Sequence, residues 1–243
     1  MANWSDPRIG ASQPTTTIGR DVTYDAGLRS HMLSVYNYMA SGVLLTGIIA
    51  VLFANWSGAP AVLYGPGPLK YVIMFAPLAF VLVLSFGINR LSTGTAQLLF
   101  WAFAAVMGVS MASIFFVYTQ GSIATTFFAT AAGFASLSLW GYTTKKDLSG
   151  MGTFLIMGLF GLIVAMVVNL FLQSSAMELA ISAIGVLIFA GLTAYDTQKI
   201  KSLYYEVGGT EFHGKAIVMS ALTLYLDFIN MFLFLLRLFG NRN

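Results

Sequence analysis

Cysteine is absent from this chain of 243 residues, and charged residues make up only 9% of it. Without cysteine there is no disulfide, thiolate nucleophile or cysteine-ligated metal site. Soluble domains carry about 25% charged residues, whereas here hydrophobic residues reach 58%. The net charge of +3 requires no nucleic acid, because basic loops beside membrane spans account for it. These features predict an all-α protein that crosses the lipid bilayer several times, without room for a second domain.

The beginning of the chain lacks an apolar core, so we do not expect a cleaved signal peptide there. We expect residues 1–30 to form a polar cytoplasmic tail and residues 31–243 to form one transmembrane domain. His31 stands at the boundary between the two. We expect this side chain at the membrane interface, because no second histidine is expected within the membrane to join it in a ligand set.

Seven apolar segments are long enough to cross a bilayer, which takes about 20 helical residues. The linker after the first segment contains Pro60, Pro66 and Pro68 and is expected to be a turn-rich external loop. Ala104, Gly108 and Ala112 recur at steps of four and predict a close contact between helices. The predicted spans are residues 33–54, 69–89, 97–118, 124–142, 152–173, 178–198 and 217–239.

The distribution of lysine and arginine predicts the orientation of these spans, since basic loops stay in the cytoplasm. With seven spans, nine basic residues fall on the side of the N-terminus and three, Lys70, Arg237 and Arg242, fall on the other. The count predicts a cytoplasmic N-terminus. A six-span alternative, in which the last segment re-enters, would place both termini in the cytoplasm.

The last segment carries an aspartate, Asp227, near its middle. An ionisable group at that depth is unfavourable in contact with lipid and is by default functional. Ser220, Thr223 and Asn230 lie at helical spacing from Asp227, so the four form one polar face. The alternative is a structural aspartate that holds the helices together.

Asp196, near the end of the sixth segment, and Arg90, at the end of the second, complete a candidate site. Two adjacent carboxylates cannot both ionise easily, so we expect Asp196 and Asp227 to share a proton that is lost as the pH rises. Arg90 is a candidate partner in a two-pronged contact that holds a closed state, although a plain basic anchor explains Arg90 equally well. The deprotonated acids would be oxygen ligands for a hard cation such as Ca²⁺.

The depths of the two acids do not match in the predicted spans. Asp196 lies about one turn inside its boundary, whereas Asp227 lies about 15 Å into its helix. They can meet only if the last helix begins well outside the lipid, or if a tilted cavity brings water inward.

Three stretches resemble motifs of the Bax inhibitor 1 family, in its bacterial branch. They are Leu224-Tyr-Leu-Asp-Phe-Ile-Asn-Met-Phe-Leu-Phe-Leu-Leu-Arg-Leu-Phe-Gly240, Ala194-Tyr-Asp-Thr-Gln198 and Lys145-Lys-Asp-Leu-Ser149. The resemblance implies seven transmembrane helices, with the C-terminal one central and wrapped by the other six. For the bacterial branch it also implies residence in the inner membrane. It further implies a pH-sensitive calcium leak in which Asp196 and Asp227 are the paired acids and Arg90 is the latch.

Two other functions compete with this channel. Paired aspartates on neighbouring helices also occur in intramembrane aspartyl proteases, but those enzymes carry Gly-x-Gly-Asp and Pro-Ala-Leu motifs, and Leu224-Tyr225-Leu226 precedes Asp227 here. We therefore expect no enzyme and no cofactor other than a permeant or bound Ca²⁺. The second alternative is a scaffold that regulates a membrane protein partner, as in suppression of stress or cell death.

Overall fold

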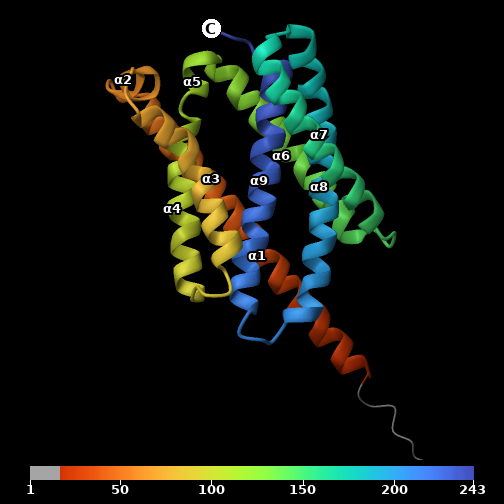
Figure 1. Ribbon diagram of the computed structural model, residues 1–243. Helices are drawn as coiled ribbons and strands as arrows, with labels where there is room; N and C mark the ends of the chain where they lie inside the picture. The colour runs from red at the N-terminus through yellow and green to blue at the C-terminus, as the bar shows by residue number, and fades with distance from the viewer. Residues whose placement is uncertain (1–16) are drawn as a thin grey trace, which may run out of the picture.

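The computed structural model describes the backbone of residues 17–243 and the side chains of residues 26–243. It is entirely helical apart from short connections, and seven of its helical stretches are long and apolar enough to cross a membrane. The helices run up and down in one bundle, and α1 begins at the end opposite the C-terminus (Figure 1). The prediction of an all-α membrane protein with seven spans is confirmed.

The spans follow the predicted segments but differ from them at the ends. The bundle comprises α1 (Thr17–Ala54), α2 (Ala59–Tyr64), α3 (Leu69–Gly87), α4 (Thr93–Met111), α5 (Ile114–Val117), α6 (Gln120–Thr143), α7 (Ser149–Leu172), α8 (Ser175–Val207) and α9 (His213–Phe239).

The first span begins earlier than predicted, because no proline interrupts the chain between Pro14 and Pro60. Half of the expected polar tail therefore belongs to α1, and residues 1–16 lie outside the described part of the chain. The loop expected after this span contains the short helix α2, with Pro60 in its first turn, where the missing N–H leaves no unmade bond.

α9 is the central helix of the bundle. In its most apolar 18-residue window 67% of the residues are buried, against 11% in α3 and in α7. It packs against α1, α4, α6 and α8, while α3 packs mainly on α4 and α7 on α8. The resemblance predicted this position, and it buries the polar side chains of Ser220 and Asp227 inside the bundle.

The side of α9 that faces α1 and α4 is closely packed. Tyr225 is fully buried there and makes edge contacts with the rings of Phe100 and Phe103. A Cβ atom added at Gly108 would lie 2.7 Å from the backbone oxygen of Thr46. The small-residue stripe predicted to allow a close helix contact therefore does so, between α4 and α1.

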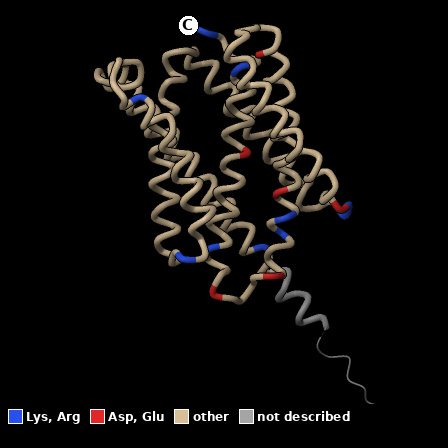
Figure 2. Tube along the Cα trace, viewed as in Figure 1, with Lys and Arg blue, Asp and Glu red and all other residues tan. Residues whose placement is uncertain are grey.

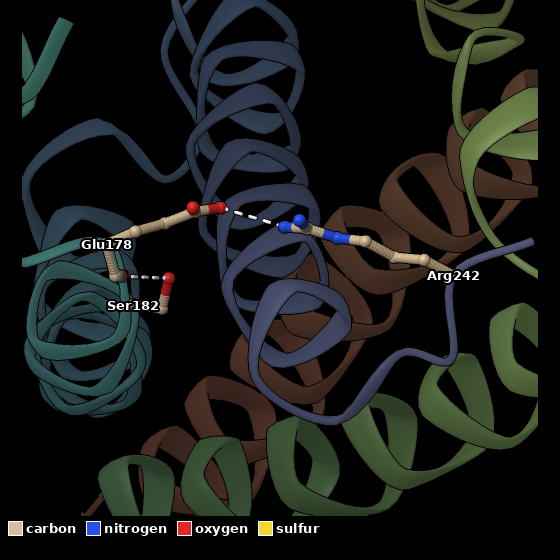
Figure 3. A network of polar contacts seen from close by, with 3 residues as sticks. All are labelled: Glu178, Ser182 and Arg242. Carbon is tan, nitrogen blue, oxygen red and sulfur yellow. Dashed lines mark hydrogen bonds and ion pairs between the residues drawn. The ribbon is translucent and has the colours of Figure 1, made fainter. Parts of the chain in front are cut away.

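Charged residues gather near the two ends of the bundle, and few interrupt its middle (Figure 2). At the C-terminal end the chain leaves α9 and crosses toward α8, where Arg242 forms an ion pair of 3.0 Å with Glu178 (Figure 3). Ser182 donates a hydrogen bond to the backbone oxygen of Glu178, one turn away. An antiparallel bridge between Tyr118 and Arg242 ties the same tail to the α5–α6 connection.

Candidate functional site

The depth mismatch between the two acids disappears because α8 and α9 both extend beyond the predicted boundaries. α8 continues to Val207, and α9 already begins at His213. Counted from the connection between these helices, Asp196 lies 11 residues back along α8 and Asp227 lies 14 residues into α9. At 1.5 Å per residue these depths differ by only about 5 Å. The longer helical hairpin thus brings the two acids to one level.

The two acids are buried and close together. Asp196 is 9% exposed and Asp227 is 5% exposed. Their carboxyl groups act on each other electrostatically across the contact between α8 and α9. Oδ2 of Asp227 has no hydrogen-bond partner among the residues that the structure describes. A buried oxygen without a partner is unfavourable by about 1–3 kcal/mol, so this carboxyl oxygen does not itself stabilise the fold.

Both carboxyl groups line one cavity of about 520 Å³ between α7, α8 and α9. Thr223 and Asn230 line the same cavity, and Asn230 donates its amide hydrogen to the backbone oxygen of Leu226. This arrangement leaves the side-chain oxygen of Asn230 available as a ligand or acceptor. Three of the four residues predicted to form a polar face on the last helix therefore meet at the cavity.

Two smaller cavities adjoin the central one. A cavity of about 290 Å³ shares Asp196, Lys199 and Thr223 with it, and the remaining predicted polar residue, Ser220, lines this neighbour together with Glu206. On the opposite side a cavity of about 340 Å³ shares Arg237 with the central cavity and is lined by Glu178. The three cavities follow one another along the seam between α7, α8 and α9.

Arg90 lies outside this site. It is exposed in the turn between α3 and α4, where its backbone N–H donates to the oxygen of Gly87. Within the described part of the chain no ion pair joins Arg90 to Asp196 or Asp227. α3 packs against α4, on the other side of the bundle from α7. The contact that the resemblance implies is thus not made in this structure, and the role of Arg90 as a latch stays a prediction.

Sequence reasoning missed the two cations that line the central cavity, Lys199 and Arg237. Lys199 lies close enough to act electrostatically on Asp196. In the sequence, both residues stand near the ends of predicted membrane spans, where basic residues are common. Their spacing held a usable signal, because Lys199 comes three residues after Asp196 and Arg237 comes ten after Asp227, which returns each to the helical face of its acid.

His31 has a histidine neighbour, contrary to the premise of its prediction, whereas its position at the membrane interface stays a prediction. The side chain is 1% exposed, and its Nδ1 lies 3.0 Å from Nε2 of His213, the first residue of α9. The ring of Tyr204 lies beside both histidines. The contact between the two histidines could not be predicted, because they are 182 residues apart in the sequence. It arises only from the packing of α1 against α9.

A family model and several bacterial proteins are similar to this chain over most of its length. The family model described as "Inhibitor of apoptosis-promoting Bax1" matches residues 28–243. A protein of Rickettsia prowazekii is 47% identical over 234 residues, which cover 96% of this chain and 99% of the relative. The inner membrane protein YbhL of Escherichia coli K12 is 46% identical over 219 residues, which cover 89% of this chain and 94% of YbhL.

Proposed function

This chain belongs to the Bax inhibitor 1 family of membrane proteins, and from that premise we propose that it is a pH-sensitive calcium leak gated by its aspartate pair. The observation that carries the proposal is the burial of Asp196 and Asp227 against each other at the wall of one cavity. Two such groups compete for protons, so the charge of the cavity depends on pH.

The three adjoining cavities support a path through the whole bilayer. They reach from Glu206 near the C-terminal end of α8 to Glu178 near its N-terminal end. These residues are 28 positions apart on one helix, which corresponds to about 42 Å. A bilayer with its headgroups is about 40–45 Å thick. The acid pair lies between the two ends of this path.

The fixed charges along the path explain how protonation would gate it. Lys199 and Arg237 line the central cavity together with the two acids. When both acids are protonated, the cavity carries two positive charges and repels cations. When both are ionised, the charges balance, and the two carboxylates attract a divalent cation from solution. Raising the pH therefore opens the path, and lowering it closes the path.

The ligands suit a cation in passage rather than one that is held. Ca²⁺ takes six to eight oxygen ligands in a tight site. Two carboxylates, the Thr223 hydroxyl and the Asn230 amide oxygen supply a smaller set around the cavity. Among residues 26–243 no group of three or more acidic, histidine or cysteine side chains is placed to hold a metal ion. Weak, partly hydrated contact is what conduction requires, because a permeant ion must also leave.

Calcium flux into liposomes tests the proposal. Purified protein is reconstituted with an enclosed Ca²⁺ indicator, and uptake is compared at about pH 6 and about pH 8, because binding of the shared proton depends on pH. We expect several-fold faster uptake at the higher pH for the native chain. The Asp196→Asn, Asp227→Asn double variant should lose this pH dependence, because amides do not titrate.

The matched control is Asp147→Asn, which removes an acid from the α6–α7 connection outside the cavities. Ser149 donates two hydrogen bonds to Asp147, and they lower the pKa of its carboxyl group. This group is therefore ionised at both test pH values, and its loss should leave the pH dependence intact. Equal uptake by the native chain and the double variant at both pH values would refute the proposed leak.

A further inference from the structure

A separate cavity of about 490 Å³ lies between α1 and α6, away from the acid pair. Six residues of α1 and five of α6 line it, and nearly all of their exposed surface is apolar. The lining residues of α1 include Arg29, Leu33, Tyr36 and Ala40, which recur at helical spacing on one face of that helix. The cavity is thus a groove that runs along two transmembrane helices.

We propose that this groove binds one anionic phospholipid, with an acyl chain between α1 and α6 and the phosphate at Arg29 and Lys201. Arg29 to Ala40 spans 11 residues of α1, or about 16 Å. The hydrocarbon core is about 30 Å thick, so the groove extends through one leaflet. A groove within the membrane does not stay empty, because its lining would lose the contacts of a packed interior.

The chemistry at the end of the groove favours an anionic headgroup. Arg29 is exposed in the part of α1 that enters the bundle. Tyr142, in the last turn of α6, lines the same end, and Nζ of Lys201 lies 5.1 Å from the centre of its ring. The lysine also donates a hydrogen bond of 3.0 Å to the backbone oxygen of Tyr142. Arg29 lines the groove, and Lys201 lies beside the lining residue Tyr142. Basic residues at a groove between transmembrane helices are typical of phospholipid headgroup sites.

An unpartnered hydroxyl group lies where the ester groups of such a lipid would come. Ser138 lines the groove and is 4% exposed, yet among the described residues its Oγ has no hydrogen-bond partner. It lies one turn, or about 6 Å, deeper along α6 than Tyr142. A lipid ester oxygen at this depth would accept its hydrogen, which a purely hydrocarbon occupant does not do.

Native mass spectrometry of the full-length protein tests the proposal. The protein in detergent is titrated with dioleoyl phosphatidylglycerol and, separately, with dioleoyl phosphatidylcholine. We expect several-fold tighter binding of phosphatidylglycerol. The Arg29→Gln, Lys201→Gln variant should lose this preference, while the control Arg90→Gln, Lys215→Gln removes two cations outside the groove and should keep it. Persistence of the preference in the first variant would overturn the proposal.

Blocking the groove separates an acyl-chain site from surface charge. Ala135→Trp fills the groove and leaves both cations in place, whereas Ala132→Trp places the same ring on an exposed position of α6 outside it. We expect only Ala135→Trp to lose phosphatidylglycerol binding. Equal binding by the two variants, or full competition by soluble glycerol 3-phosphate, would overturn the lipid assignment. Arg29→Gln alone, at an exposed side chain, serves if the double variant does not purify intact.

Discussion

Tyr225 and Asp227 are two residues apart on α9 and both are buried, but their surroundings differ. The Tyr225 hydroxyl is 2.7 Å from Oγ1 of Thr46, which in turn donates to the backbone oxygen of Ala104. Asp227 faces a cavity with one carboxyl oxygen unpartnered in the described structure. One side of the central helix is packed and hydrogen-bonded, and the other is hollow. The difference teaches that α9 lies between a closely packed part of the bundle and a part that contains the acid-lined cavity.

The largest effect on the packed side is expected for Tyr225→Ala. The ring is fully buried among its neighbours, so its removal leaves a large cavity between α1, α4 and α9. We expect the free energy of unfolding to fall by about 3–5 kcal/mol, measured by denaturant titration in detergent. Tyr225→Phe keeps the ring and should lose only about 0.5–1.5 kcal/mol. Similar losses in both variants would show that the hydroxyl, not the packing, matters.

A smaller loss is expected for Gly108→Leu, which forces α4 away from α1. The added side chain would meet Ile49 as well as the Thr46 backbone. Overpacking of this kind reduces the free energy of unfolding by about 1–3 kcal/mol. The control is Gly133→Leu, where an added Cβ meets nothing within 4 Å. If both variants unfold at the same denaturant concentration, the contact between α4 and α1 at Gly108 is not as close as described.

On the hollow side the expected effect has the opposite sign. Asp227→Asn removes a buried ionisable group without changing its shape. The free energy of unfolding should stay level or rise, by no more than the roughly 1–3 kcal/mol that an unpartnered buried group forfeits. Calcium uptake should meanwhile depend less on pH, because only Asp196 of the pair is left to titrate. A strong loss of stability, with transport unaffected, would favour a structural aspartate.

The smallest effect is expected at the end of the bundle. Glu178 and Arg242 form an ion pair whose side chains are 44% and 59% exposed. Exposed pairs contribute about 0–1 kcal/mol and are screened by salt. Arg242→Gln should therefore change the unfolding midpoint only slightly, and even less at high ionic strength. A large change would mean that the C-terminal tail holds α8 in place, which the packing of α9 alone would then not achieve.

Much of this fold follows from composition and periodicity. Each of the seven spans is a long run of apolar residues with turn signals at its ends, and a bilayer permits such a run only one structure, the α-helix. The polar spacing of Thr223, Asp227 and Asn230 likewise required a shared helical face, and these residues share one cavity. The boundaries were less predictable, because α1 and α8 continue as helices beyond the lipid, where hydrophobicity no longer marks them.

The sequence by itself determined that two acids lie in the membrane on successive helices, since the length of each apolar run fixes what must cross. Only the tertiary structure decided that Asp196 and Asp227 share a level, that Lys199 and Arg237 line their cavity, and that His31 meets His213. These are contacts between residues far apart along the chain. They depend on how long each helix continues and which face it turns inward, and neither quantity is encoded by any single segment.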